Sequence, residues 1–285
     1  MCDFCKRFGK GLKWYLNPEN YSKEMLKSGR VQRDMMDVIG FEGSMIDILS
    51  GPSRQSFEEG LAAMADTAVP DIRDKESVQG LSLILEQSHG GQVIPLEDAK
   101  KIVNLAMGPI MVQECYCRKY FGDEGKFSCM WLYPVSEEAE AQRPWEEHRK
   151  LSKEEAKKLL EELDGEGCYH SIYWAPVPYP IVICNCDPLF CISYKARMAY
   201  GVQKAVLKGE YVAVVDHQKC DGCEEDVPKC LTRCPFGAMR FSPLAKKVFV
   251  DIQKCFGCGL CRGACHTGAI KLVDRTSIPT VREVW

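Results

Sequence analysis

The sequence predicts an α+β protein in two parts, a cysteine-rich α+β domain over residues 1–208 and a smaller domain over residues 209–285. In the first part, segments with helical spacing of apolar residues lead into short apolar strands. In the second part, short strands flank two groups of closely spaced cysteines, and Lys208-Gly209 marks the boundary. A chain of 285 residues is long enough to bury a substantial core in two domains.

Several segments of the first part have recognisable local signals. Residues 55–68 carry apolar side chains at helical spacing and predict a helix, and residues 78–87 form a second apolar stretch. Three prolines make residues 174–180 a rigid connector, because proline fixes its backbone angle φ. Residues 193–207 predict a last helix before the boundary.

Two further segments share the order of a helix, an apolar strand and a Cys-x-Cys motif. The first follows Pro95 and the second follows Ser152. Ser152 and Glu155 have the spacing of a capping box, and Asp164-Gly165 is expected to end that helix. We interpret the pair as an internal repeat in which each helix leads to a cysteine-bearing strand.

Composition limits the classes of partner and compartment. The chain has 37 Lys and Arg against 40 Asp and Glu, a formal net charge of -3, which argues against nucleic acid or an anionic membrane as partner. No apolar run approaches the ~20 residues of a membrane helix, and the start has no apolar core like that of a signal peptide. We therefore expect a cytoplasmic protein without membrane insertion.

Cysteine is unusually abundant, with 17 residues, and the odd count excludes complete disulfide pairing within the chain. Eight cysteines form two groups near the C-terminus with the spacing of metal ligands. The first group is Cys220, Cys223, Cys230 and Cys234, and the second is Cys255, Cys258, Cys261 and Cys265. We expect reduced thiols that hold iron, in an anaerobic host because exposed clusters are sensitive to oxygen. The alternative, a pair of zinc sites, does not suit eight cysteines in this order.

The flanking residues complete a pattern that resembles the bacterial-type dicluster ferredoxins over residues 209–285. Strands are expected at residues 211–216, 247–251 and 269–273. Glycines beside the cysteines let the loops turn and present N–H groups to sulfur atoms. These are Gly222, Gly257 and Gly259. The resemblance implies a ferredoxin-type (βαβ)2 fold, two [4Fe-4S] clusters and low-potential transfer of single electrons.

The resemblance also implies crossed ligation, in which the last cysteine of each group binds the cluster of the other group. Cluster I would then be held by Cys220, Cys223, Cys230 and Cys265, and cluster II by Cys255, Cys258, Cys261 and Cys234. Two departures from the family pattern are the six residues 224–229 between Cys223 and Cys230, and His266 in place of proline after Cys265.

Two Cys-x-Cys motifs in the first part predict a third metal site. Cys115 and Cys117 follow one apolar strand, and Cys184 and Cys186 follow another. Alternation along a strand places both thiols of a pair on one face, so two neighbouring strands would gather all four thiols. Thiols ~6.6 Å apart along a strand and ~4.8 Å apart across strands are too widely spread for zinc and suit an iron–sulfur cluster better.

Alternatives remain open for these and the other cysteines. Zinc, or packed thiols without metal, would also explain the two motifs, and Cys129 or Cys191 would be a substitute ligand. Cys168 is expected to be a core residue. Cys2 and Cys5 form either half of a metal-binding knuckle or part of a mobile N-terminus.

These patterns predict an iron–sulfur electron-transfer protein, or a subunit of an anaerobic redox complex, that works with donor and acceptor proteins. One rival is a redox enzyme whose active site is a metal or cluster in residues 1–208, supplied with electrons by residues 209–285. Another is a redox-sensing or assembly protein. No phosphate-binding loop, dinucleotide fingerprint or catalytic triad is recognisable.

Overall fold

A computed structural model describes residues 3–22, 79, 91–142, 145–174, 179–223 and 227–283. The predicted helix at residues 55–68 lies outside the described residues, as does the stretch 78–87 apart from Gln79. The described chain is a mixture of helices and strands, in agreement with the α+β prediction, and a large sheet occupies the first part.

The sheet has seven strands in the order β4-β2-β3-β6-β5-β1-β7. Neighbouring strands run antiparallel, except that β1 and β7 are parallel. The strands are β1 (Gly91–Ile94), β2 (Ile110–Glu114), β3 (Phe127–Trp131), β4 (His148–Leu151), β5 (Tyr169–Trp174), β6 (Pro180–Cys186) and β7 (Val206–Leu207). The short strand β3 therefore lies between the two strands that precede or carry the Cys-x-Cys motifs.

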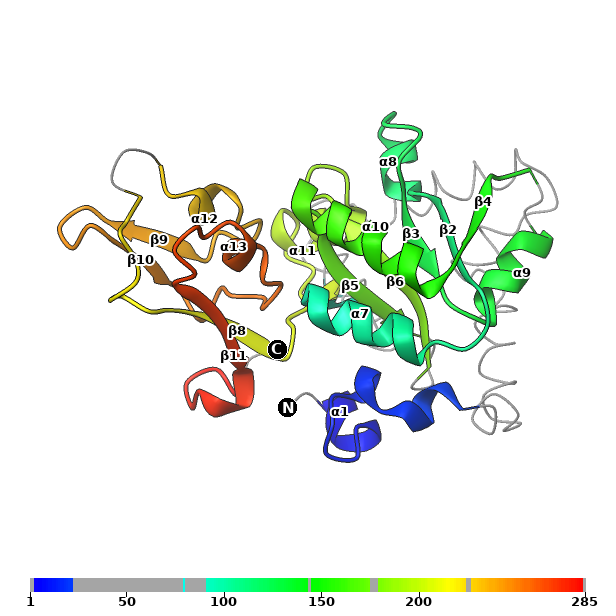
Figure 1. The fold of residues 1–285 in the computed structure, drawn as a ribbon, viewed down its shortest axis with the longest axis horizontal. Coiled ribbons are helices and arrows are strands. Elements are labelled where there is room, and N and C mark those ends of the chain that lie inside the picture. Colours follow the sequence, from blue (N-terminus) through cyan, green and yellow to red (C-terminus); the bar gives the residue numbers. More distant parts are fainter. Residues whose placement is uncertain are drawn as a thin grey trace.

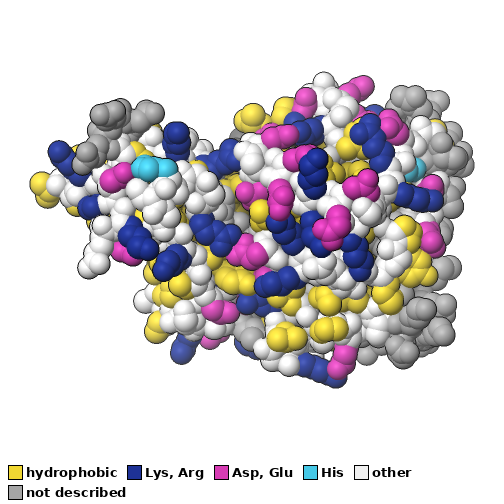
Figure 2. Space-filling view, viewed as in Figure 1, with side chains coloured by type: hydrophobic (Ala, Val, Ile, Leu, Met, Phe, Trp, Pro, Cys, Tyr) yellow, Lys and Arg dark blue, Asp and Glu magenta, His cyan; other side chains and the backbone are white. Residues whose placement is uncertain are grey.

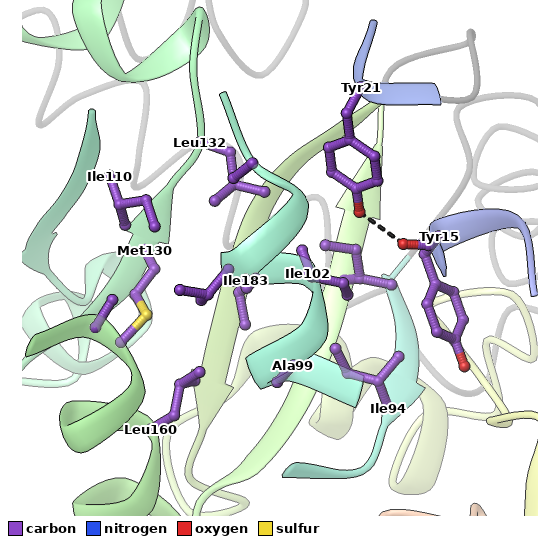
Figure 3. Packing of buried hydrophobic residues seen from close by; sticks show 14 of the residues in the cluster. Tyr15, Tyr21, Ile94, Ala99, Ile102, Ile110, Met130, Leu132, Leu160 and Ile183 are labelled. Carbon is purple, nitrogen blue, oxygen red and sulfur yellow. Dashed lines mark hydrogen bonds between the residues drawn. The ribbon is translucent and has the colours of Figure 1, made fainter. Parts of the chain in front are cut away.

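Two helices cover one face of this sheet, α7 (Leu96–Leu105) and α10 (Lys153–Glu166), and they lie side by side in Figure 1. Their apolar residues pack against alternate residues of the central strands, as Figure 3 shows for Ile102, Met130 and Ile183. The N-terminal segment adds Tyr15 and Tyr21 to the same core, and the hydroxyl of Tyr21 donates to the carbonyl of Tyr15 at 2.7 Å.

Helix α10 has the predicted capping box, because Ser152 accepts from the backbone N–H of Glu155 and the Glu155 carboxylate accepts in return. The predicted end at Asp164-Gly165 is slightly too early, since the helix continues to Glu166. Gly167 ends it with a left-handed φ of 105°, which a side chain would disfavour.

The segment after the second Cys-x-Cys motif differs from the single helix predicted over residues 193–207. Helix α11 (Ile192–Met198) is short, and Gly201 turns the chain with a φ of 76°. Strand β7 follows and pairs with β1. Shorter helices complete the described first part: α1 (Asp3–Phe8), η1 (Trp14–Leu16), η2 (Pro18–Tyr21), α8 (Tyr116–Tyr120) and α9 (Val135–Gln142).

The C-terminal part has two strand–helix–strand units (Figure 1). The first is β8 (Tyr211–Val215), α12 (Lys229–Thr232) and β9 (Met239–Ser242), and the second is β10 (Lys247–Val250), α13 (Leu260–Gly263) and β11 (Ile270–Asp274). Strand β8 pairs with β11, and β9 pairs with β10, both antiparallel. The turn η3 (Arg275–Ser277) follows β11. This exchange of strands places the two cysteine-bearing loops close together.

The surface agrees with a near-neutral charge balance. Figure 2 shows Lys and Arg side chains mixed with Asp and Glu side chains over the visible face, without a broad patch of one sign. Within the part of the chain that the structure describes, no helix has the length and apolar character needed to cross a membrane.

Candidate metal centres

The C-terminal cysteines lie in two sets of four, and the first set combines both cysteine groups. Burial raises the pKa of Cys230 to about 11, and the nearby thiols of Cys223, Cys265 and Cys220 raise it further. Cys265, the last cysteine of the second group, thus faces the first three cysteines of the first group. This is the set that the resemblance implies for cluster I.

The second set has the reciprocal composition. Burial, together with the nearby thiols of Cys255 and Cys234, raises the pKa of Cys261 to about 12. Burial likewise raises the pKa of Cys258, and the nearby thiols of Cys261, Cys234 and Cys255 raise it further. Cys234 from the first group therefore lies with three cysteines of the second, as crossed ligation requires.

The surroundings of these thiols suit iron–sulfur clusters. Backbone N–H groups point at sulfur, from Ala213 to Cys255 Sγ and from Ala238 to Cys234 Sγ, both at 3.3 Å. Such donors stabilise the negative charge of cluster sulfurs and thiolates. Gly257 has a φ of 76°, and a Cβ there would lie 2.2 Å from the carbonyl oxygen of Tyr211. The loop can therefore follow this path only with glycine.

A buried arginine fixes the same loop. The guanidinium of Arg275 donates to the carbonyls of Gly209 and Tyr211, each at 2.9 Å, and to that of Cys255 at 2.8 Å. The side chain is fully buried. Arg275 thus ties the beginning of strand β8 to the loop that begins with Cys255.

His266, the residue that replaces proline, lies at the outer side of the first set. Its Nε2 is 2.8 Å from Asp221 Oδ2, and both side chains are exposed. Among the described residues, Asp221, Cys223 and His266 form a group whose ligand atoms lie within 4.8 Å of one another. Part of the charged insertion after Cys223 lies outside the described residues.

The N-terminal Cys-x-Cys motifs are not arranged as the sequence predicts. Strands β2 and β6 are not neighbours, because β3 pairs with both. Cys115 is the N-cap of α8 and Cys117 lies inside that helix, so strand alternation does not apply to them. It does apply to Cys184 and Cys186 on β6. The physical reason is that the chain turns back after β2 through residues 115–126, which include helix α8, so that β3 pairs antiparallel with β2 and separates it from β6.

Strand β3 contributes a further cysteine to the same place. Cys129 on β3 lies directly opposite Cys184 on β6, and Ser171 on β5 lies opposite Cys184 on the other side. The next residues along, Met130 and Ile183, point into the core under the helices. Because side chains alternate along strands, Cys129 and Cys184 project from the opposite face of the sheet.

Six thiols meet on this face in a closed ring, in which each interacts with two neighbours. In order, the ring is Cys115, Cys117, Cys191, Cys186, Cys184, Cys129 and back to Cys115. We call it the thiol ring. It unites the four predicted ligands with Cys129 and Cys191, which the sequence indicated only as substitutes.

The thiol ring is too open for one zinc ion. Within the described residues, no three ring sulfurs lie within 4.8 Å of one another. Tetrahedral zinc with Zn–S bonds of ~2.3 Å needs four sulfurs about 3.8 Å apart. In an iron–sulfur cluster each cysteine binds a different iron atom, so the cysteine sulfurs lie farther apart than those around a single zinc ion. The donor set and its spread therefore fit a multi-iron cluster.

The ring thiols shift one another's pKa values. Hydrogen bonds from the thiols of Cys117 and Cys129 lower the pKa of Cys115, and those of Cys117 and Cys186 lower the pKa of Cys191. The hydrogen bond that Cys129 makes raises the pKa of Cys184. Metal binding would replace the thiol protons, because thiolates are the ligands.

Hydroxyl and backbone groups surround the ring at hydrogen-bonding distance. The Tyr169 hydroxyl lies 3.3 Å from Cys191 Sγ, and the Ser171 hydroxyl lies 3.6 Å from Cys186 Sγ. The backbone N–H of Tyr194 donates to Cys191 Sγ at 3.4 Å. These contacts repeat the type of N–H and O–H surroundings found at the C-terminal sets.

Two other described cysteines, Cys168 and Cys5, lie outside the ring and contact charged side chains rather than other thiols. Burial raises the pKa of Cys168 to about 11, and the Arg118 guanidinium nearby opposes this shift. Cys5 is buried, and its thiol donates to Glu210 Oε1 at 3.0 Å. Cys5 is therefore held by contacts within the protein, and Cys2 lies outside the described residues.

Comparisons with known proteins bear on the C-terminal part. A family model for the 4Fe-4S dicluster domain matches residues 219–269. A sulfite dehydrogenase subunit of Allochromatium vinosum is 44% identical over 55 residues, which are 19% of this chain and 22% of that protein. The chain thus matches about a fifth of that relative's length. No solved structure matches. These findings confirm the ferredoxin-type resemblance and support an iron–sulfur electron-transfer role: residues 219–269 match the 4Fe-4S dicluster domain.

Proposed function

We propose that the protein is an electron-transfer protein, or a subunit of a redox complex, that moves single electrons through two C-terminal [4Fe-4S] clusters and a third cluster in the thiol ring. The eight C-terminal cysteines act as the two crossed ligand sets. In this proposal the chain has two domains, residues 1–208 with the thiol ring and residues 209–285 with the two C-terminal clusters. The observation that carries the proposal is the meeting of six thiols on one sheet face, beside a dicluster domain.

Each part of the site has a separate task in this proposal. The thiolates bind iron, and a bound iron–sulfur cluster supplies reversible one-electron transfer. Backbone N–H groups and the Tyr169 and Ser171 hydroxyls stabilise charge on sulfur. The ring offers two thiols more than the four that a [4Fe-4S] cluster takes. The predicted ligands Cys115, Cys117, Cys184 and Cys186 are therefore supplemented by neighbours that can compete for the same iron.

The setting of the protein is part of the proposal. The name of the Allochromatium vinosum relative describes a subunit, which supports work within a complex with donor and acceptor proteins. Thiolate-bound iron is sensitive to oxygen, and free thiols such as those of the described cysteines persist in reducing compartments, which supports an anaerobic, cytoplasmic setting.

A redox enzyme is the second candidate, and one observation favours it. Cys115, Cys117 and Cys184 are partly exposed, whereas Cys186 and Cys191 are buried. Partial exposure on the side of these three residues would give a small molecule access to iron bound there. If carbon monoxide or cyanide changes the spectrum of the ring site, the enzyme is favoured; an unchanged spectrum favours electron transfer alone.

Iron and sulfide counts on the full-length protein, reconstituted without oxygen, test the main proposal. We expect about twelve irons per chain, and about eight in the quadruple variant Cys115→Ala, Cys117→Ala, Cys184→Ala, Cys186→Ala, because the two ring thiols that remain cannot hold a four-iron cluster. Cys168→Ala is the matched control, since Cys168 is buried nearby but outside the ring. About eight irons in all three proteins, or stoichiometric zinc that only the quadruple variant loses, would refute the third cluster.

A further inference from the structure

The thiol ring is joined to the second C-terminal cysteine set by a continuous buried contact. One apolar cluster contains Cys186 and Cys191 of the ring, Cys258 of the C-terminal set, and aromatic residues between them. The aromatic residues that bridge the gap are Tyr169, Phe236 and Phe256. All three are nearly inaccessible to solvent, with at most 4% of each side chain exposed. Water is thus excluded along the whole contact.

The three rings touch in sequence. The Tyr169 ring packs edge-on against Phe236, with centroids 5.2 Å apart, and Phe236 stacks on Phe256 with centroids 4.0 Å apart and an interplanar angle of 9°. Tyr169 begins the series with its hydroxyl 3.3 Å from Cys191 Sγ.

The other end of the series is attached to the C-terminal set through the chain itself. Phe236 is two residues after Cys234, and Phe256 directly follows Cys255. Both residues therefore extend from ligand loops of the same predicted cluster. Electron tunnelling weakens steeply with distance and is faster through packed atoms than across a gap, so this is a short route in a dense medium.

Polar contacts hold the two ends of this route in place. The Tyr194 hydroxyl donates to the carbonyl of Pro235, next to Phe236, and the backbone N–H of Gly209 donates to the carbonyl of Phe256 at 2.8 Å. Arg262 forms two hydrogen bonds to the carboxylate of Glu97 on α7, at 2.9 and 2.6 Å. The contact between the sheet and the C-terminal part is therefore a packed interface with fixed geometry.

The first C-terminal set has no such contact among the described residues. Cys220 and Cys230 share an apolar cluster of the C-terminal part with Cys255 and Cys261 of the second set, and that cluster contains no cysteine of the thiol ring. Cys223 and Cys265 are partly exposed, beside the exposed pair of Asp221 and His266. The first set thus lies on the outer side, with the second set between it and the aromatic contact.

We infer that the thiol ring exchanges electrons directly with the cluster held by Cys234, Cys255, Cys258 and Cys261, across Tyr169, Phe236 and Phe256, and is the inner end of a linear relay. This inference rests on the third cluster proposed above. One electron leaves the second set, which is oxidised, and enters the ring site, which is reduced. No bond forms or breaks, and an external low-potential one-electron donor supplies the electron to the outer set.

Electron paramagnetic resonance on the fully reduced full-length protein tests the order of the relay. Two reduced clusters in close contact broaden or split each other's signals. We expect the ring signal to be split in the unchanged protein and in Cys168→Ala. It should remain split in the double variant Cys220→Ala, Cys223→Ala, which removes the outer site. The splitting should disappear in Cys255→Ala, Cys258→Ala.

Iron counts on the same samples separate the existence of the third cluster from the order of the relay. Absence of ring iron in the unchanged protein refutes the third cluster itself. Ring iron with an unsplit signal, or with splitting that the Cys220→Ala, Cys223→Ala variant removes, overturns the relay order while leaving the third cluster intact. If the Cys255→Ala, Cys258→Ala variant does not fold, the outer-site variant alone decides, since the inference requires that it keep the splitting.

Discussion

Replacement of Arg275 by methionine should selectively weaken the second C-terminal site. Arg275 is fully buried and donates to three backbone carbonyls, including that of Cys255. Methionine fills much of the same volume but donates no hydrogen bond. The change therefore removes the tie between the start of strand β8 and the ligand loop without creating a large cavity.

The magnitude follows from the lost contacts. A hydrogen bond from a charged donor contributes about 1.5–3 kcal/mol. Recovery of the dehydration cost of the buried guanidinium offsets part of the loss, so we expect a net destabilisation of about 3–5 kcal/mol. If the loop must open before the cluster is lost, the rate of iron loss should increase roughly 100-fold or more, because each 1.4 kcal/mol changes the open fraction about tenfold.

The assay is the rate at which an iron chelator bleaches the visible absorbance of the full-length protein. Arg282→Met is the matched control, because Arg282 lies in the same segment but its side chain is 59% exposed. We expect the fast phase to account for the iron at the Cys255 loop alone. A rate within about threefold of the control would contradict the reasoning, because such a ratio corresponds to well under 1 kcal/mol.

Three further predictions concern the caps, the interface and the ligands. Ser152→Ala should lower the free energy of unfolding by about 1 kcal/mol through loss of the capping box, measurable by thermal unfolding. Although burial raises it, the hydrogen bond from Arg262 lowers the pKa of Glu97, so this pair should stabilise the fold above pH 4.5 and lose that effect as the pH falls through the folded-state pKa. Glu97→Gln should cost up to ~1 kcal/mol at neutral pH and nothing in strong acid, because the pair is partly exposed. Cys234→Ala should change the magnetic resonance signal of the cluster beside Cys258; a change confined to the other C-terminal signal would show that the ligation is not crossed.

The grouping of three neighbouring cysteines in each C-terminal loop could be predicted because its determinants are local. Three cysteines in a tight loop must meet wherever that loop folds, and Gly257 is required by a backbone angle that its own loop sets. The capping box of Ser152 is local in the same way. These signals do not depend on which strands become neighbours.

The thiol ring could be predicted only in part, because it depends on long-range strand pairing. Cys-x-Cys motifs marked Cys115, Cys117, Cys184 and Cys186, but the sequence did not show that β3 pairs with both β2 and β6. That pairing places Cys129 opposite Cys184. Strand β3 has the sequence Phe-Ser-Cys-Met-Trp and is buried over its last four residues, so no alternation of polar and apolar residues marks Cys129 as a ligand.

The structure of residues 193–207, which follow the second Cys-x-Cys motif, was predicted wrongly for a different reason. Residues 193–207 have helical apolar spacing, yet Gly201 turns the chain so that β7 can complete the edge of the sheet. The short helix α11 has Cys191 as its N-cap, and that cap points the thiol into the ring. Tertiary pairing thus overrides a local preference for helix.

The central claim is that the chain carries electrons through three iron–sulfur sites, and the most direct test is the number of electrons it accepts. Full-length protein, reconstituted without oxygen, is titrated with a low-potential one-electron reductant while the visible absorbance is followed. We predict about three electrons per chain, and about two in the quadruple variant Cys115→Ala, Cys117→Ala, Cys184→Ala, Cys186→Ala, because each four-iron cluster accepts one and the two ring thiols that remain cannot hold a cluster. Uptake of only about two electrons by the unchanged protein, with no decrease in the variant, would contradict the central claim.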